Sequence, residues 1–339
     1  MSKLIHRRSF VKGISGVAVA PYLAACGPAL EDPLVSPAEA PIGPFGAEST
    51  AEEVTEGIAL SGMTAVVTGA NSGLGFETMR VLALRGAHVI GTGRTLEKAE
   101  AACDSVSGNA TPAILELTDF DSIAACTDQI RALGRPIDML ICNAGIMALP
   151  ELEQVNGVEK QFAVNHLGHF LFVNRLLEPV VAAPQGRVVM VSSMGYKFAP
   201  PEGIQFDNLS GERDYEPNEA YGQSKLANGL FSLELARRLE PTSATSNSVH
   251  PGIIMTNLGR HMEEWKQFAA RLIGWTFMKS IPEGAATQCY VAASPALTGV
   301  SGLYFVDCNP VIPEPSMHDV QQAARLWEVS EELTDGYLG

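Results

Sequence analysis

The chain has 339 residues, of which 46% are hydrophobic and 18% charged; this composition fits one large globular domain with appendages and excludes a fibrous or disordered protein. The formal net charge of -15 argues against nucleic acid as a partner, because affinity for a phosphate backbone comes mainly from Lys and Arg. Beyond Cys26, the five remaining cysteines show neither metal-ligand spacing nor the pattern of a disulfide framework.

Residues 1–25 follow the order of an export signal, with a basic head, a short apolar run and small residues before a cleavage point. Arg7–Lys12 (RRSFVK) resembles the twin-arginine export motif, and Leu23–Cys26 (LAAC) resembles a lipobox in which Cys26 is lipidated. We therefore expect a bacterial periplasmic protein that meets the membrane only through a lipid on Cys26. The alternative is a poorly hydrophobic anchor or a soluble tail, and then a cytoplasmic location.

Residues 26–48 contain five prolines and no apolar periodicity, so they are expected to form a flexible linker. Ser49 and Thr50 precede acidic residues in a way that is typical of a helix start. The folded domain is therefore expected to span residues 49–339. We expect this domain to be α/β, a single Rossmann-like doubly wound sheet of about seven parallel strands.

The first strand is expected at 64–68, followed by a glycine-rich turn and a helix over 76–85. This order places a helix N-terminus beneath a phosphate, where free N–H groups favour an anion. A simple tight turn is the alternative. The glycine spacing G-x-x-x-G-x-G resembles the fingerprint of short-chain dehydrogenases more than the ordinary G-x-G-x-x-G. The candidate cofactor-binding residues of this turn are Gly69, Asn71, Ser72, Gly73, Leu74 and Gly75.

The second strand, expected at 87–92, is followed by Gly93 and Arg94. In dinucleotide folds an acid near this point binds the ribose 2′-hydroxyl, whereas a basic residue suits a 2′-phosphate. Since the acid is absent and Arg94 is present, NADP(H) is expected to be preferred over NAD(H). The alternative is a surface arginine at the start of the helix over 96–102.

A third strand is expected at 113–117, with Asp119 among the residues that cap the next helix. By the resemblance to short-chain dehydrogenases, Glu116 and Leu117 would lie near the adenine, although the family usually has Asp at position 116. A fourth strand runs from 138 into Asn143-Ala144-Gly145. This sequence resembles the family's Asn-Asn-Ala-Gly, whose small residues let the strand end pass under the cofactor; a plain strand-to-loop glycine is the alternative.

Three further stretches complete the resemblance to short-chain dehydrogenases/reductases, in particular to the retinol dehydrogenase branch. They are 164–170 (VNHLGHF), 188–193 (VVMVSS) and 221–228 (YGQSKLAN). The family transfers a hydride between a nicotinamide and a carbonyl or alcohol carbon, which requires a proton donor or acceptor at the oxygen. The expected partners of the protein are a nicotinamide cofactor and a small-molecule carbonyl or alcohol.

Tyr221 and Lys225 are four residues apart in a helix expected over 221–239, so they share one face of it. A free phenol titrates near 10, and a neighbouring ammonium favours the phenolate. We therefore expect Tyr221 to be the acid/base and Lys225 to tune it. The resemblance implies that Lys225 also binds the nicotinamide ribose, that Ser193 rather than Ser192 hydrogen-bonds the substrate oxygen, and that Asn165 supports a proton relay. Taken singly, each residue could instead serve packing or capping.

His166 and His169 are three residues apart without a third ligand nearby, so they are expected to be packing residues rather than metal ligands.

The turn after another apolar run resembles the family's Pro-Gly turn, and the cofactor-binding candidates there are Pro251, Gly252 and Thr256. Residues 194–220 are expected to form one wall of the substrate cleft. Residues 257–281 resemble the family's lid, and their apolar side chains favour a lipophilic substrate; an ordinary core-covering helix is the alternative.

A helix over 285–293 and a last strand over 302–305 are expected to close the fold. The main competing hypothesis is an exported NADP-binding scaffold or sensor without turnover. A nucleotide-sugar epimerase or dehydratase is disfavoured by the glycine spacing. The family often pairs subunits through helices, so a homo-oligomer is possible, although no feature of this sequence indicates one independently.

Overall fold

The structure, a computed structural model, describes residues 36–38, 40–254 and 278–338. The chain divides into two units, 1–34 and 35–339, and every described residue belongs to the second. Cys26 and the predicted signal and lipobox lie outside the described residues, as do Thr256 and all of the predicted lid except 278–281.

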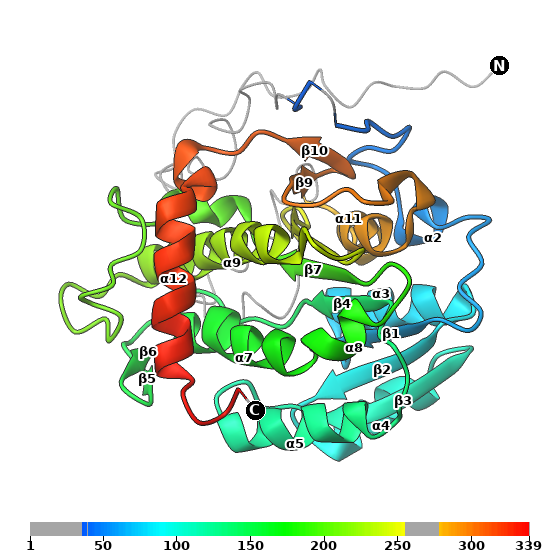
Figure 1. Cartoon of the computed structure of the whole chain (residues 1–339), viewed down its shortest axis with the longest axis horizontal. Helices are drawn as coiled ribbons and strands as arrows, with labels where there is room; N and C mark the ends of the chain where they lie inside the picture. The colour runs from blue at the N-terminus through cyan, green and yellow to red at the C-terminus, as the bar shows by residue number, and fades with distance from the viewer. Residues whose placement is uncertain (1–35, 39, 255–277, 339) are drawn as a thin grey trace, which may run out of the picture. The chain divides into compact units, whose positions relative to one another are not determined.

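A single eight-stranded sheet forms the centre of the second unit, in the order β10-β9-β8-β7-β4-β1-β2-β3 (Figure 1). Seven strands run parallel, and β10 pairs antiparallel with β9. The strands are β1 (Thr64–Val67), β2 (His88–Gly93), β3 (Asn109–Ile114), β4 (Met139–Cys142), β7 (Arg187–Val191), β8 (Thr245–His250), β9 (Tyr304–Val306) and β10 (Asn309–Val311). A separate hairpin joins β5 (Gln154–Val155) to β6 (Val158–Glu159).

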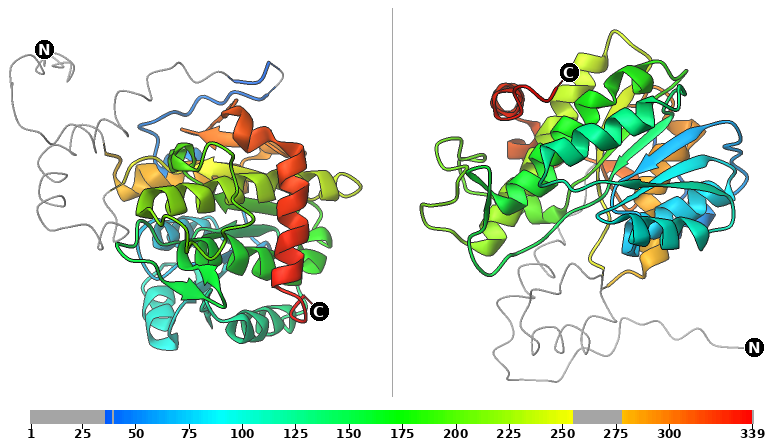
Figure 2. Two further views of the ribbon diagram at one scale, coloured as in Figure 1. Left: turned by 90° about the vertical axis from the view of Figure 1, so that its left-hand side faces the viewer. Right: turned by 90° about the horizontal axis from the view of Figure 1, so that it is seen from below.

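Helices cover both faces of the sheet, as the right-hand view of Figure 2 shows. One face packs against α2 (Ala51–Val54), α3 (Gly73–Leu84), α4 (Leu96–Asp104) and α11 (Ile281–Ala293). The other packs against α5 (Phe120–Arg131), α6 (Lys160–Phe162), α7 (Gly168–Arg175), α8 (Leu177–Val181), α9 (Pro217–Leu239) and α12 (Val320–Leu333). Because both faces are covered, the inner strands β1, β4 and β7 are buried along their whole length.

The helix starts follow the local signals in the sequence. Thr50 and Glu53 form a reciprocal capping box at the start of α2. Asp119 caps α5 by accepting from the N–H groups of Asp121 and Ser122, as predicted. In α9, Glu216 caps the first turn and Pro217 occupies it, so the helix begins four residues before the predicted start at Tyr221.

The prediction of about seven parallel strands missed β10. The chain reverses after β9 through Asp307 and Cys308, whose φ angles are +52° and +64°, in a two-residue hairpin that pairs Val306 with Asn309. Such turns favour Asn-Gly or Asp-Gly. Because position 308 is cysteine instead of glycine, the sequence gives no hairpin signal.

The third strand was predicted too late in the chain. It spans Asn109–Ile114 instead of 113–117, so Glu116 and Leu117 follow the strand rather than ending it. Pro112 lies inside β3, where it discourages a strand assignment from sequence. The proline is tolerated because β3 is at the edge of the sheet.

The predicted linker 26–48 makes defined contacts before it reaches residue 49. The N–H of Gly43 donates to Asn309 Oδ1 over 3.3 Å, and Asn309 Nδ2 donates to the carbonyl of Phe45 over 2.8 Å. The Phe45 ring packs edge-on against Tyr290 of α11. The ordered contacts of the fold therefore begin at least six residues earlier than predicted.

Candidate active site

The glycine turn after β1 is packed directly against the end of β4. A Cβ atom added at Gly75 would lie 2.4 Å from the carbonyl oxygen of Gly69 and 2.5 Å from Asn143 Nδ2. Asn143 Nδ2 donates to the carbonyl of Thr68 over 2.9 Å. The predicted turn and the predicted Asn143-Ala144-Gly145 segment therefore form one cradle, in which only a glycine fits at position 75.

The first helix of the fold starts within this cradle. Ser72 is the N-cap of α3 in extended conformation and makes no side-chain capping bond. Gly69 and Gly73 have φ angles of +67° and +58°, which are the left-handed values that favour glycine. The cradle therefore presents backbone N–H groups at a helix N-terminus, an arrangement that binds phosphates.

Arg94 and Glu116 follow strands β2 and β3 next to the cradle. Arg94 is exposed and immediately precedes Thr95, the N-cap of α4. The Glu116 carboxylate accepts hydrogen bonds from the N–H and the hydroxyl of Thr118 over 3.1 and 2.9 Å, and Leu117 is buried. The Glu116 carboxylate therefore stabilises the loop after β3 by accepting hydrogen bonds from Thr118.

Ser193 and Tyr221 both lie next to Gly195. Ser193 ends the extended segment after β7, and its Oγ accepts from the N–H of Gly195 over 3.0 Å. A Cβ atom added at Gly195 would lie 3.2 Å from Ser193 Oγ and 2.8 Å from Cε1 of Tyr221. The absence of a side chain at position 195 therefore lets the serine hydroxyl and the tyrosine ring approach each other.

Lys225 lies one helical turn after Tyr221 and is almost fully buried. Its Nζ is 5.8 Å from the centre of the Tyr221 ring and donates to the carbonyl of Val191 over 3.0 Å. Burial lowers the pKa of Lys225 to about 8, so roughly nine in ten of these amines are protonated at pH 7. A cation therefore lies beside the tyrosine at neutral pH.

Asn165 lies in a single π-helical turn, Ala163–Leu167, between α6 and α7. Its Oδ1 accepts from the N–H of Ile146, and its Nδ2 donates to the carbonyl of Ile146 and to Ser224 Oγ, all over 2.8 to 2.9 Å. A Cβ atom at Gly145 would lie 3.1 Å from Asn165 Oδ1 and 3.5 Å from Lys225 Nζ. Asn165 and Lys225 thus flank Gly145, and all four predicted catalytic residues gather beyond the ends of β4 and β7.

Ser192, the rejected member of the serine pair, is buried and donates from Oγ to the carbonyl of Lys225 over 2.7 Å. It therefore anchors α9 to β7.

The Pro251-Gly252 turn follows β8, where Gly252 has a φ angle of +98° and packs against Lys279. Lys279 in turn forms an ion pair with Asp307 over 2.5 Å.

Two histidines position parts of this site, which the sequence analysis missed. His250 Nδ1 accepts from the N–H of Met194 over 3.2 Å and so ties the Ser193 turn to the Pro251-Gly252 turn. His169 was predicted only to pack, yet it contacts Thr68 Oγ1 and the carbonyl of Asn165, both over 2.9 Å. His169 lies in the motif 164–170 and His250 directly precedes the Pro251-Gly252 turn, but their partners are distant in sequence.

The comparisons with known proteins agree with this geometry. Residues 63–267 match the family model described as short chain dehydrogenase. The chain belongs to the short-chain dehydrogenase family. It is similar to the short-chain dehydrogenase TIC 32 B, chloroplastic, of Brassica napus, at 41% identity over 86% of this chain and 94% of that protein. It is also similar to human retinol dehydrogenase 14, at 41% identity over 80% of this chain and 86% of that protein.

Solved structures of short-chain dehydrogenases share the fold. An uncharacterised protein from Mycobacterium paratuberculosis superposes with a TM-score of 0.68 at 35% identity, covering 83% of this chain and 96% of that one. A protein from Beutenbergia cavernae, described as an NAD(P)-dependent gluconate 5-dehydrogenase, holds NADP at low occupancy. It superposes with a TM-score of 0.57 at 26% identity over 73% of this chain and 95% of that one. This short-chain dehydrogenase is thus an oxidoreductase of an NAD(P)-dependent family.

The predicted periplasmic, lipid-anchored location is wrong. The relatives from Brassica napus are chloroplastic, and the retinol dehydrogenases are from mouse and human. The prediction depended on a short stretch of basic, apolar and small residues, and such a composition does not specify one compartment. No helix among the described residues combines the length and apolar character that crossing a membrane requires.

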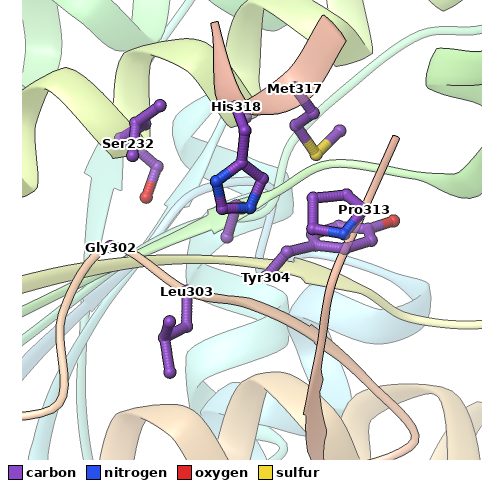
Figure 3. Close-up of a pocket in the computed structure, with 10 residues that line it drawn as sticks. Ser232, Gly302, Leu303, Tyr304, Pro313, Met317 and His318 are labelled. Carbon is purple, nitrogen blue, oxygen red and sulfur yellow. The ribbon is translucent and has the colours of Figure 1, made fainter. Parts of the chain in front are cut away.

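A shallow pocket lies away from the four catalytic candidates of the short-chain dehydrogenase. Figure 3 shows Met317 and His318 projecting into it from one side and Tyr304 of β9 lining the other. Tyr304 is buried, and its hydroxyl has no hydrogen-bond partner among the described residues. Because none of the four catalytic candidates lines this pocket, the candidate active site remains at the ends of β4 and β7.

Proposed function

We propose that this protein transfers a hydride between NADP(H) and the carbonyl or alcohol carbon of a small, hydrophobic substrate. The observation that carries the proposal is the placement of the Tyr221 ring, which has the Ser193 hydroxyl near one edge and the Lys225 ammonium 5.8 Å from its centre. A proton donor, a hydrogen-bond donor and a cation thus meet beside the glycine cradle.

The residues of the cradle fit a dinucleotide. At Gly75 an added Cβ would collide with the carbonyl oxygen of Gly69, and Gly69 and Gly73 have positive φ angles. The turn therefore favours glycine at all three positions, and glycines let a phosphate approach the backbone closely. Gly69, Asn71, Ser72, Gly73, Leu74 and Gly75 would hold the pyrophosphate side, Asn143, Ala144 and Gly145 would lie under the cofactor, and Pro251 and Gly252 would border it. The nicotinamide, when bound, supplies or accepts the hydride.

Four side chains of the protein supply the rest of the chemistry. For reduction, Tyr221 gives its phenolic proton to the substrate oxygen while the carbonyl carbon receives the hydride; for oxidation, the phenolate takes that proton back. Lowering a phenol pKa from about 10 to about 7 requires roughly 4 kcal/mol, and the Lys225 ammonium contributes to that stabilisation. Ser193 donates to the substrate oxygen, and Asn165 and Lys225 supply the proton relay.

Apolar side chains around these groups support the proposed substrate class. Ile146 and Met194 follow Gly145 and Ser193 directly, and both are half-buried apolar residues. The name of the relative retinol dehydrogenase 14 also points to a lipophilic alcohol. Homo-oligomerisation and the lid over 257–281 stay predictions.

The decisive experiment is the variant Tyr221→Phe. We expect its rate with NADPH and a panel of apolar aldehydes and ketones to fall at least a thousandfold, because the substrate oxygen has lost its proton donor. The dissociation constant for NADPH should change less than threefold. An unchanged rate would show that Tyr221 is not the acid/base. Wild-type protein that binds NADPH but reduces nothing would favour a scaffold without turnover.

Arg94→Ser tests the cofactor preference. We propose that the exposed Arg94 guanidinium binds the 2′-phosphate, a charge-assisted contact worth about 1.5–3 kcal/mol. The kcat/KM ratio of NADPH over NADH should therefore fall about tenfold or more, with NADH values nearly unchanged. The control is Lys98→Gln, a change at an exposed position in the first turn of α4, the helix that follows Arg94. Equal losses in both variants would mean that general positive charge, rather than Arg94, sets the preference.

A further inference from the structure

His169 joins the cofactor cradle to the π-helical turn that carries Asn165. It is fully buried in α7. Its Nε2 lies 2.9 Å from Thr68 Oγ1 at the end of β1, and its Nδ1 lies 2.9 Å from the carbonyl oxygen of Asn165. The imidazole thus spans two segments that are about a hundred residues apart in the chain.

The hydrogen bonds of Thr68 determine which ring nitrogen carries the proton. Thr68 Oγ1 accepts from the N–H groups of Asn143 and Ala144, both over 2.9 Å. A hydroxyl has two acceptor lone pairs and one proton to donate. Because both lone pairs are used, the hydroxyl of Thr68 donates to His169 Nε2. The proton of the neutral ring is therefore on Nδ1, and Nδ1–H donates to the carbonyl of Asn165.

His166, three residues earlier, has the opposite tautomer by the same reasoning. Ser330 Oγ donates its one proton to the carbonyl of Leu326 over 2.7 Å. It must therefore accept from His166 Nε2, which lies 2.9 Å away, so His166 carries its proton on Nε2. His166 Nδ1 has no partner among the described residues. His166 thus provides a buried control histidine that contacts no residue of the cradle.

We propose that His169, as the neutral Nδ1–H tautomer, is a positioning residue that fixes Asn165 relative to the turn of Thr68, Asn143 and Ala144. This inference rests on the proposed function, since the site it positions is the proposed relay. With His169 in place, the carbonyl of Asn165 and both its side-chain polar atoms are bound. A shift of the cofactor cradle is then transmitted to Asn165 through one rigid ring.

The surroundings keep the imidazole neutral. Burial lowers the pKa of His169 to about 4, the carbonyl of Asn165 opposes this shift, and the Lys225 ammonium adds to it. His169 also interacts electrostatically with His166, which helps to lower the pKa of His166. In a protonated ring, Nε2–H would point at the Thr68 hydroxyl proton, and a second cation would lie near Lys225. The neutral form therefore preserves both the bridge and the charge of Lys225.

The tautomer can be measured without turnover. A long-range ¹H–¹⁵N correlation spectrum of ¹⁵N-histidine protein at pH 7 distinguishes protonated from bare ring nitrogens, with resonances assigned by their loss in His169→Asn and His166→Leu. We expect a protonated Nδ1 for His169 and a protonated Nε2 for His166. A His169 ring protonated on Nε2, or on both nitrogens, would overturn the proposal.

Two substitutions separate the two bonds of the ring. Asn at position 169 can still donate to the carbonyl four residues earlier, as Asn174 does to Phe170 over 2.8 Å in the same helix, but it is too short to reach Thr68. Leu at this position makes neither bond. We expect His169→Asn to raise the KM for NADPH about threefold to tenfold with kcat within threefold of wild type. His169→Leu should also lower kcat at least tenfold.

The control variant is His166→Leu, for which kcat and KM should stay within twofold of wild type even if stability falls. If the wild-type protein is active, equal kcat values for folded His169→Leu and His169→Asn would show that the hydrogen bond to the carbonyl of Asn165 does not position Asn165 for catalysis. A wild-type protein without turnover would instead remove the proposed function, and the tautomer measured by NMR would then stand as a structural feature only.

Discussion

At the scale of single residues, Gly145 shows how tightly the site is packed. It lies between Asn165 Oδ1 and Lys225 Nζ, and an added Cβ would stand 3.1 Å from the amide oxygen. Asn165 holds Ile146 through the same oxygen, so it cannot move without disturbing the segment 143–146. One methyl group should therefore matter more for catalysis than for folding.

We predict that Gly145→Ala lowers kcat about tenfold while the unfolding free energy drops by only about 1–3 kcal/mol, the usual range for overpacking. Steady-state kinetics and urea unfolding of the same preparation measure the two effects. Gly46→Ala is the matched control, because a Cβ there meets nothing within 4 Å. A wild-type kcat in Gly145→Ala would mean that Asn165 and Lys225 tolerate displacement.

Sequence spacing predicts contacts within one helix better than contacts between segments. Tyr221 and Lys225 were found because four residues make one helical turn. The bond from Thr68 to His169 joins residues 101 positions apart, and nothing local in either segment indicates it. The histidine therefore looked like a packing residue until the fold brought the two segments together.

At the scale of elements, one aromatic side chain of α12 contacts two other helices. Trp327 stacks on Phe231 of α9 and meets Phe170 of α7 edge-on, with ring centres 5.5 and 5.1 Å apart. The Arg238 guanidinium lies 4.0 Å from the Trp327 ring, which adds a cation–π contact. The ring thus connects the C-terminal helix to α9, which carries Tyr221 and Lys225, and to α7, which follows the turn that carries Asn165.

We predict that Trp327→Ala lowers the unfolding free energy by about 3–5 kcal/mol, as expected when a buried aromatic ring leaves a cavity. Chemical denaturation monitored by circular dichroism measures this loss. Leu333→Ala, at an exposed position near the end of the same helix, should cost less than about 1 kcal/mol. Similar losses for the two variants would show that the buried Trp327 ring contributes no more to stability than an exposed side chain of the same helix.

The elements β3 and β10 share one property: their local residues argue against the conformation that the whole fold imposes. Pro112 lies inside β3, and Asp307 and Cys308 adopt positive φ without glycine. At β3 the position at the sheet edge supplies what the local sequence does not, and at Cys308 the neighbouring helix α11 does. Pro112 is tolerated at an edge strand, and Cys308 is stabilised by its buried contacts with Thr287.

At the scale of the whole molecule, a mostly parallel α/β sheet covered by helices on both faces followed from the sequence, because motifs in this family stand at strand ends. The compartment did not follow, since a short stretch of basic, apolar and small residues does not specify one compartment. The response of the folded chain to acid is likewise a property of the whole molecule, because it depends on how many histidines the core holds without charge.

Three histidines are buried in their neutral form. Desolvation lowers the pKa of His166 to about 3 and those of His169 and His250 to about 4, whereas an unfolded histidine titrates near 6.5. Below pH 6.5 the unfolded chain therefore binds protons that the folded chain does not. By linkage, the unfolding free energy falls as the pH drops from about 6.5 toward 4.

Each histidine contributes at most about 1.4 kcal/mol per pH unit in this window, so three acting together give a steep dependence. Glu159, whose pKa is raised by burial, acts in the opposite direction, because the folded chain takes up a proton there more readily than the unfolded chain. Urea unfolding at half-unit steps between pH 7 and 5 should show stability falling by several kcal/mol, and His169→Asn should reduce the slope. A flat profile would require that the histidines titrate with nearly ordinary pKa values in the folded protein, and the neutral imidazole between Thr68 and Asn165 would then be lost at mildly acidic pH.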